Sequence, residues 1–246
     1  MTKTALITGA GSGVGRAVAQ TLLTHGWQVA LVGRRREPLE QTARGHEDKS
    51  LILSFDVSDP AAVAEGFKTL EAQWGRLDML FNNAGSGTPA TTPDELAVEQ
   101  WLDVVGVNLN GSFFCAREAF RMMRHQTPQG GRIINNGSIS AHSPRPGSIA
   151  YTATKHAITG LTKTLCLDGR PFNIVASQID IGNAATLMTE RMVTGTIQAD
   201  GDIRPEARMD VQHVADMVYH IAQMPLEANI LNMTIMASKM PFIGRG

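Results

Sequence analysis

The chain has 246 residues, of which 43% are hydrophobic and 18% charged, and its formal net charge at pH 7 is -1. This size and composition fit one α/β domain with a sizeable core, and the balanced charge argues against the basic surface that nucleic-acid binding needs. Because no apolar run approaches the roughly 18 residues of a membrane span, we expect a cytoplasmic protein with neither membrane nor nucleic-acid partners.

Short apolar runs alternate with longer segments of helical periodicity, a pattern typical of βαβ units. We therefore predict an α/β fold in which a doubly wound, parallel, seven-stranded sheet carries helices on both faces, as a single domain over residues 1–246. The predicted strands are Thr4 to Thr8, Gln28 to Val32, Leu51 to Phe55, Leu77 to Asn82, Arg132 to Asn136, Asn173 to Gln178 and Ile230 to Met236.

A glycine-rich segment, Thr8-Gly9-Ala10-Gly11-Ser12-Gly13-Val14-Gly15, lies between the first predicted strand and a helix. Without β-carbons, Gly9, Gly13 and Gly15 let the backbone turn tightly and approach a pyrophosphate at the helix N-terminus. Glycines of this kind also occur in ordinary strand-to-helix turns. The order of strand, loop and helix favours a dinucleotide site.

Three arginines follow the second predicted strand, in the segment Gly33-Arg34-Arg35-Arg36. An enzyme that selects NAD commonly has an acidic residue here, which accepts a hydrogen bond from the ribose and would repel a 2′-phosphate. A guanidinium instead binds that phosphate through two charge-assisted hydrogen bonds. We predict NADP(H) as the cofactor, with Arg34 and Arg35 as contacts. NAD(H) is the less favoured alternative as cofactor. The other interpretation is that the arginines simply face water at the start of a helix and bind no phosphate.

The middle of the chain predicts two consecutive helices. Thr92-Pro93-Asp94-Glu95 has the pattern of a capping box, and apolar residues then recur at helical spacing from Ala97 to His125, with a break expected around Asn108 to Gly111. Cys115 and Cys166 lie in predicted helices without metal-ligand spacing. We expect reduced, core-facing thiols and no metal site.

A serine, a tyrosine and a lysine carry the predicted chemistry. Tyr151 and Lys155 are one helical turn apart and share a face, while Ser138 follows the fifth predicted strand. A free phenol has a pKa of about 10, and we expect the nearby ammonium, together with a positively charged nicotinamide, to favour the phenolate. Taken singly, these residues would be a surface pair and a turn serine, and Ser140 is an alternative to Ser138.

Two further segments flank this set. His142 and Arg145, in the loop from Ala141 to Ile149, are candidates for binding an acidic substrate, or else are solvated. Residues 181–210 show little periodicity, and we predict a substrate-side lid there. The methionines of this segment either line an adaptable apolar pocket or simply pack, and they are Met188, Met192 and Met209.

The TGxxxGxG segment, Asp56-Val57, Asn82-Asn83-Ala84-Gly85 and the Ser138, Tyr151 and Lys155 set resemble the short-chain dehydrogenase/reductase family over nearly the whole chain. The resemblance implies a Rossmann-type fold and a small-molecule carbonyl or alcohol substrate. It also implies a homo-oligomer, either a tetramer or a dimer, formed through helices from about Gly111 to His125 and from Ser148 to Leu167.

The resemblance also assigns the site residues. The implied catalytic residues are Asn108, Ser138, Tyr151 and Lys155, with Asn108 organising a water that links Lys155 to solvent. The implied cofactor-binding residues are Gly9, Ser12, Gly13, Val14, Gly15, Arg34, Arg35, Asp56, Val57, Asn83, Ala84, Gly85, Tyr151, Lys155, Ile181 and Thr186. The family's Pro-Gly after the sixth strand is absent, so backbone near Ile181 and the side chain of Asn183 or Thr186 are the candidates for holding the nicotinamide amide.

The predicted activity is hydride transfer between NADP(H) and a carbonyl or secondary alcohol, in the form of ketone reduction. Tyr151 would act as general acid, Ser138 would hydrogen-bond the oxygen, and Lys155 would hold the nicotinamide ribose. An NAD-linked alcohol dehydrogenase and a non-catalytic, cofactor-sensing protein of the same fold are the alternatives.

Overall fold

A parallel seven-stranded sheet forms the centre of the computed structural model, which describes residues 2–243. The strand order is β3-β2-β1-β4-β5-β6-β9, and every neighbouring pair is parallel. The strands are β1 (Thr4–Thr8), β2 (Gln28–Gly33), β3 (Ser50–Ser54), β4 (Met79–Asn82), β5 (Gly131–Asn136), β6 (Ile174–Gly182) and β9 (Asn232–Met236). The predicted doubly wound sheet in a single domain is confirmed, with all seven strands.

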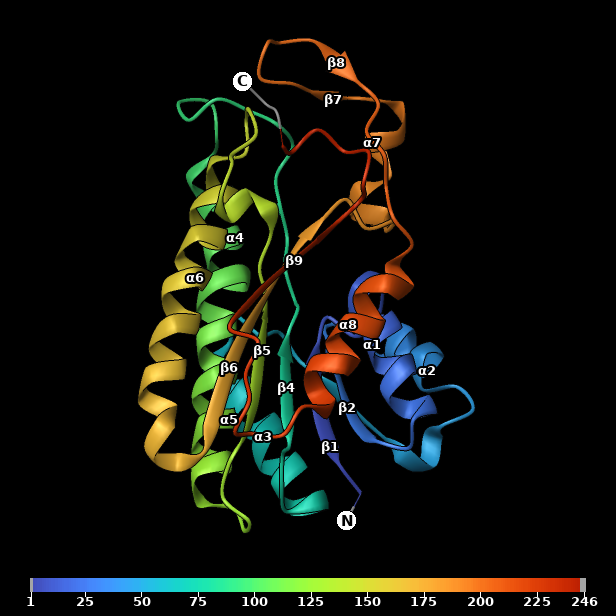
Figure 1. The fold of residues 1–246 in the computed structure, drawn as a ribbon, viewed down its shortest axis with the longest axis vertical. Coiled ribbons are helices and arrows are strands. Elements are labelled where there is room, and N and C mark those ends of the chain that lie inside the picture. Colours follow the sequence, from blue (N-terminus) through green and yellow to red (C-terminus); the bar gives the residue numbers. More distant parts are fainter. Residues whose placement is uncertain (1, 244–246) are drawn as a thin grey trace.

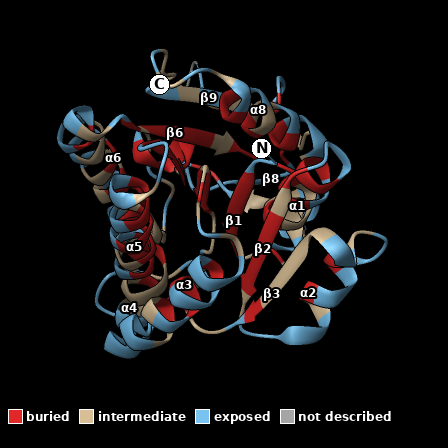
Figure 2. Ribbon diagram, turned by 90° about the horizontal axis from the view of Figure 1, so that it is seen from below, coloured by how far each residue is buried: buried red, intermediate tan, exposed pale blue. Residues whose placement is uncertain are grey.

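Helices cover both faces of the sheet (Figure 1). One layer holds α1 (Gly13–Thr24), α2 (Arg36–Ala43) and α8 (Val211–Gln223), and the other holds α3 (Pro60–Trp74), α4 (Val98–Val105), α5 (Ser112–His125) and α6 (Ile149–Gly169). Alternate residues of β1 serve the two layers, since Ile7 packs in the α1 and α8 core and Leu6 in the α3 and α5 core. The inner strands β1, β2, β4 and β5 are therefore buried on both faces, whereas the edge strands β3 and β9 are only partly buried. Figure 2 shows this difference between β1 and β2, in red, and β3, in tan.

Helix starts follow ordinary capping chemistry where the sequence supplies an aspartate. The Asp59 carboxylate accepts from the amides of Ala61 at 2.9 Å and Ala62 at 3.2 Å, and Pro60 occupies the first position of α3. Asp210 caps α8 through the amide of Gln212 at 2.9 Å. Both helices begin where their capping side chain fixes them.

The predicted capping box at Thr92 is wrong. Residues 92–96 form a turn closed by the backbone carbonyl of Thr92, and α4 begins only at Val98, without a side-chain cap. The turn stops because Ala97 adopts an extended conformation, with ψ of 138°. The two consecutive helices expected here are found as α4 and α5. The interruption near Asn108 is a π-helical turn, η2 (Gly106–Gly111), through which the helical backbone continues.

The sixth strand is longer than predicted. It extends to Gly182 because β9 pairs along it, from Gln178 with Asn232 to Gly182 with Met236. The excursion expected over residues 181–210 therefore begins at Asn183. It ends at Asp210, the residue that caps α8.

This excursion lies beyond the carboxyl ends of the strands, at the top of Figure 1. It contains η5 (Leu187–Thr189), α7 (Arg191–Thr194) and a small antiparallel hairpin of β7 (Thr196–Ile197) and β8 (Ile203–Arg204). Short 3₁₀ turns elsewhere are η1 (Glu47–Lys49), η3 (Ile139–Ala141) and η4 (Arg170–Phe172). We call residues 183–209 the lid segment.

Two smaller points concern the cysteines and membrane spans. Cys115 is buried, Cys166 is half-buried, and both are free thiols. Within residues 2–243, no helix combines the length and the apolar character needed to cross a membrane.

Candidate active site

The glycine loop between β1 and α1 approaches its neighbours too closely for side chains. Gly9 and Gly13 adopt left-handed conformations, with φ of 66° and 51°. A β-carbon on Gly15 would lie 2.3 Å from the carbonyl oxygen of Gly9 and 2.5 Å from Nδ2 of Asn83. The N-terminus of α1, a 12-residue helix, follows directly and provides the partial positive charge that attracts phosphate.

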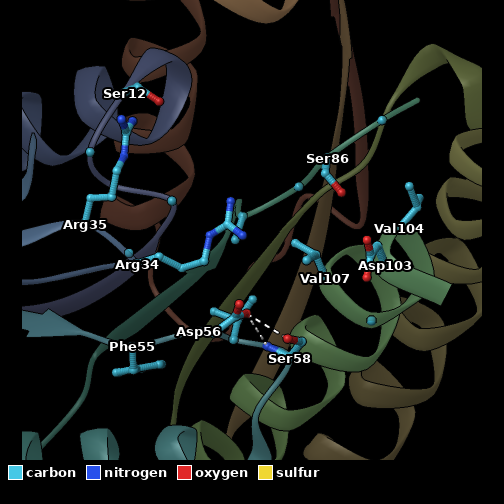
Figure 3. Close-up of a pocket in the computed structure, with 18 of the residues that line it drawn as sticks. Ser12, Arg34, Arg35, Phe55, Asp56, Ser58, Ser86, Asp103, Val104 and Val107 are labelled. Carbon is cyan, nitrogen blue, oxygen red and sulfur yellow. Dashed lines mark hydrogen bonds between the residues drawn. The ribbon is translucent and has the colours of Figure 1, made fainter. Parts of the chain in front are cut away.

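A cavity of about 690 Å³ extends from this loop across the ends of β2 and β3 (Figure 3). Arg34 and Arg35 both point into it, Arg35 toward Ser12 and Arg34 across the side that holds Asp56. Ser58 donates to Asp56 from its amide at 2.9 Å and from its hydroxyl at 2.8 Å. Burial raises the pKa of Asp56, but the bonds from Ser58 and the charge of Arg34 outweigh burial and lower it.

A second cavity, of about 190 Å³, joins the glycine loop to the turn after β4 and to α6. Its lining includes Gly9, Ser12, Gly13, Val14, Asn83, Ala84, Gly85, Tyr151, Lys155 and Thr186. The hydroxyl of Thr8 accepts from the amides of Asn83 and Ala84, both at 2.9 Å, and Nδ2 of Asn83 donates to the carbonyl of Thr8 at 3.0 Å. These bonds fix the carboxyl ends of β1 and β4 side by side.

Ser138, Tyr151 and Lys155 meet beside the end of β5. Nζ of Lys155 donates to the carbonyl of Asn136 at 2.7 Å and lies 5.5 Å from the centre of the Tyr151 ring. Oγ of Ser138 accepts from the amide of Ser140 at 3.1 Å, and a hydrogen bond from Ser138 lowers the pKa of Tyr151. Ser140 thus supports Ser138 through its backbone.

The expected effect of Lys155 on the tyrosine is corrected by the structure. Burial raises the pKa of Tyr151; the Ser138 hydrogen bond opposes this, and the negative charge of Asp180 adds to it. Burial also lowers the pKa of Lys155 to about 8, against the opposing charge of Asp180. Desolvation therefore dominates both groups, and the protein without cofactor favours the neutral phenol over the phenolate.

Asn108 lies buried in the π-helical turn η2. Its Oδ1 accepts from the amide of Ser86 at 2.8 Å, and its Nδ2 donates to the carbonyl of Ser86 at 3.0 Å and to Oγ1 of Thr154 at 3.2 Å. The side chain consequently holds the segment after β4 against α6, next to Lys155. A π-helical turn often marks a functional position, because it reorients one residue of a helix.

Asp180 is a site residue that the sequence did not reveal. It is fully buried on β6, where Oδ1 accepts from the amide of Ser138 at 2.9 Å and from Gln178 at 2.7 Å. Its Oδ2 contacts Nε2 of His142 at 2.7 Å and accepts from Asn232 at 2.9 Å. The only available signal was an acidic residue inside an otherwise apolar strand.

Neither of the two polar residues singled out in the following loop is merely solvated. His142 pairs with Asp180, and Arg145 forms a two-pronged ion pair with the buried Glu206 of the lid segment, at 2.6 and 2.5 Å. Both residues bind acidic groups of the protein itself.

A third cavity, of about 260 Å³, opens on the other side of Tyr151. Its walls come from the loop before α6 and from the lid segment, and Tyr151 lines it together with Ser138. Ile181, expected beside the cofactor, lines this cavity, whereas Thr186 faces Gly13, whose β-carbon would lie 3.2 Å from Cγ2 of Thr186. Tyr151 thus separates a cavity next to the glycine loop from one beneath the lid segment.

The parallel sheet, the glycine loop and the adjoining Ser138, Tyr151 and Lys155 define an oxidoreductase of the dinucleotide-binding α/β class. The chain matches the family model of the short chain dehydrogenases over residues 3–196, and it belongs to that family.

Individual relatives span different reactions. The chain is 37% identical over 192 residues to a 3beta-hydroxysteroid dehydrogenase of Mediterraneibacter gnavus, which covers 77% of this chain and 68% of the relative. The structure of ElxO with NADP bound superposes with a TM-score of 0.84 at 26% identity, covering 96% of this chain and 98% of that one. A 3-ketoacyl-(acyl-carrier-protein) reductase from Brucella melitensis complexed with NADH has a TM-score of 0.84 at 24% identity, with 96% of each chain covered.

The close approach at Gly15 predicts a stability difference between two helical glycines. Gly15→Ala forces the new methyl group against the Gly9 carbonyl, and we expect it to destabilise the protein by about 1–3 kcal/mol. Gly160→Ala, in α6, meets no atom within 4 Å and should be neutral or stabilising by about 0.5–1 kcal/mol. Urea denaturation measures both, and equal stability of the two variants would refute the packing described for the loop.

Proposed function

We propose that this protein reduces the carbonyl group of a small molecule with NADPH, and oxidises the corresponding secondary alcohol in reverse. The observation that carries the proposal is the position of Tyr151, which lines both the cavity beside the glycine loop and, together with Ser138, the cavity beneath the lid segment. A substrate carbonyl in the second cavity would meet a proton donor on one side and the cofactor on the other.

The residues of the first two cavities fit a dinucleotide. The glycine loop and the N-terminus of α1 would hold the pyrophosphate. Gly9 and Gly15 let this loop fold closely against Asn83 and its own backbone. By family resemblance, Asp56 and Val57 would hold the adenine, while Asn83, Ala84 and Gly85 would line the cleft toward the nicotinamide. When bound, the dinucleotide supplies the hydride that the substrate carbon receives.

The protein's own side chains would handle the proton. The hydroxyl of Ser138, which lines the cavity beneath the lid segment beside Tyr151, would hydrogen-bond the substrate oxygen. Tyr151 would protonate that oxygen, and its raised pKa keeps the phenol neutral and ready to donate at neutral pH. Lys155 would hold the nicotinamide ribose, and a water beside Asn108 would connect it to solvent for reprotonation.

We propose NADP(H) over NAD(H) because both Arg34 and Arg35 point into the large cavity. No acidic side chain stands at Gly33, at the end of β2, to oppose a 2′-phosphate. Structural relatives include complexes with NADP and one with NADH, and the preference proposed for this chain rests on these arginines.

We also propose a homo-oligomer, either a dimer or a tetramer, located in the cytoplasm. The proposed contact is formed by the helices α4, α5 and α6, which expose large apolar side chains to solvent. These are Val98, Leu102, Phe113, Ile149 and Leu167. The two free thiols suit a reducing compartment.

The cofactor proposal predicts a difference within one arginine run. In the double variant Arg34→Ser/Arg35→Ser, the dissociation constant for NADPH should rise at least tenfold while that for NADH changes little, because only the 2′-phosphate loses its charge-assisted bonds. Arg36→Ser is the control, since Arg36 is exposed and already paired with Glu40 at 2.8 Å. Fluorescence titration measures both constants. Equal losses for NADPH and NADH would contradict the assignment.

The proposed acid predicts a difference between the two tyrosines of the chain. Tyr151→Phe should lower kcat for NADPH-dependent ketone reduction by about 10²–10⁴-fold, because the proton donor is lost. Tyr219→Phe, whose ring stacks on His25, should retain wild-type activity. A screen of carbonyl compounds for NADPH oxidation supplies the substrate. If the Tyr151→Phe enzyme remained fully active, this mechanism would be refuted. If the wild-type protein bound the cofactor but turned over no carbonyl compound, the cofactor-sensing alternative would be favoured.

The pKa of Lys155, about 8, predicts the pH above which activity falls. A lysine is charged below its pKa, so kcat/KM for NADPH should fall as the pH rises through about 8, where Lys155 loses the charge that holds the ribose. Asp180→Asn removes a charge that raises this pKa and should move the limit to lower pH. Asp216→Asn, on α8, is the control for loss of a carboxylate. A limit that stays in place or moves upward in Asp180→Asn would contradict the electrostatic role of Asp180.

A further inference from the structure

The cavity beneath the lid segment combines apolar side chains with hydroxyl groups and two arginines. Next to Ser138 and Tyr151 lie Ile139 and Ile181, and the lid segment closes the space from the other side. The apolar side chains that the lid segment contributes to this lining are Met188, Met192, Ile197 and Ile203. Several of these are exposed without a ligand, including Ile203 at 70% and Met188 at 56%. Exposed apolar side chains around a concave site favour an apolar guest.

The cation closest to the interior of this cavity is already neutralised. Arg145 lines the cavity with only 13% of its side chain exposed, and both prongs of its guanidinium donate to Glu206, whose side chain is fully buried. Glu206 also accepts from Asn183 at 2.7 Å and from Gln198 at 2.9 Å. Burial alone would raise the pKa of Glu206, but these bonds and Arg145 lower it to about 2, so the carboxylate is charged at any working pH.

An anionic substrate group that bound Arg145 would compete with Glu206 for a guanidinium whose charge that carboxylate already neutralises. A buried carboxylate that loses its cation is strongly unfavourable, and its charge would also repel the incoming anion. Arg191 lines the cavity too, but it is an exposed side chain on α7, where water screens its charge.

We infer that the cavity selects carbonyl compounds whose body next to the reacting carbonyl is apolar and uncharged, and that Glu206 is a specificity-determining residue that excludes acids by pairing with Arg145. The inference rests on the proposed function, because it places the substrate in this cavity. It identifies Arg145 as a structural tie between the catalytic loop and the lid segment, in contrast to the acid-binding role considered from the sequence.

The test compares a neutral compound with its acid. Ethyl 4-oxo-4-phenylbutanoate and 4-oxo-4-phenylbutanoate share the ketone and the phenyl group and differ in one negative charge. Isothermal titration of each into the enzyme saturated with NADP⁺ gives dissociation constants that do not depend on turnover. We expect the ester to bind at least tenfold more tightly than the acid. Equal or tighter binding of the acid overturns the inference. Failure of the ester to bind at concentrations up to about 10 mM also overturns it.

Glu206→Gln provides the decisive variant. It keeps the size and the hydrogen-bonding capacity of the side chain but releases the charge of Arg145, so the acid should gain at least tenfold in affinity relative to the ester. A dissociation constant for the ester within about threefold of the wild-type value shows that the cavity has kept its shape. Glu71→Gln, which removes an exposed carboxylate paired with Arg121 at 2.9 Å, should change neither constant.

Two outcomes separate this inference from the proposed function. Tight binding of the ester without NADPH oxidation would remove the proposed reaction and leave the selectivity in place. Turnover of the acid at the rate of the ester would support the reaction and overturn the selectivity. If Glu206→Gln does not fold, the double variant Arg145→Met/Glu206→Gln tests the same point and leaves neither charge unpaired. The ester should bind as before and the acid should gain no affinity, whereas a gain by the acid would overturn the role of Arg145.

Discussion

A single buried carboxylate, that of Asp180, holds the loop after β5 to the sheet. Asp180 accepts or shares four hydrogen bonds, which reach the amide of Ser138, His142 in the following turn, Gln178 on its own strand and Asn232 on β9. The contact is so close that a β-carbon on Gly137 would lie 2.0 Å from its Oδ1. Both oxygens are satisfied, which is the condition under which a buried charge is tolerated and fixes one geometry. The position of Ser138, and with it the hydrogen bond to Tyr151, depends on this anchor.

The same carboxylate shapes the electrostatics of the site. Its charge opposes the desolvation of Lys155 and adds to that of Tyr151, so the ammonium is retained more easily and the phenol ionises less easily. Under the proposed function, the neutral phenol is the form that protonates a substrate oxygen.

How much of this the sequence could predict depends on the range of each interaction. Apolar periodicity predicted all seven strands, and the parallel arrangement then placed the residues after β1, β2, β4 and β5 at one edge of the sheet. Local signals were less dependable, since the four-residue pattern at Thr92 supports only a turn. Polar pairs between distant parts of the sequence could not be predicted, because His142 and Asp180 are 38 positions apart, and Arg145 and Glu206 are 61 apart, with no periodic pattern to connect them. The direction of the Tyr151 pKa was mistaken for a similar reason, because spacing on a helix does not reveal burial.

The ion pair between Arg145 and Glu206 joins two segments that protein engineers would treat as independent modules. A lid transplanted from another member of the family would bring its own residue to position 206 while the recipient loop still carried arginine. Such a chimaera would leave one buried charge without its counterpart, close to the serine on which chemistry depends. Segment exchange in this fold therefore has to move both halves of the pair together, and directed evolution of the substrate range would advance by paired changes at these two positions.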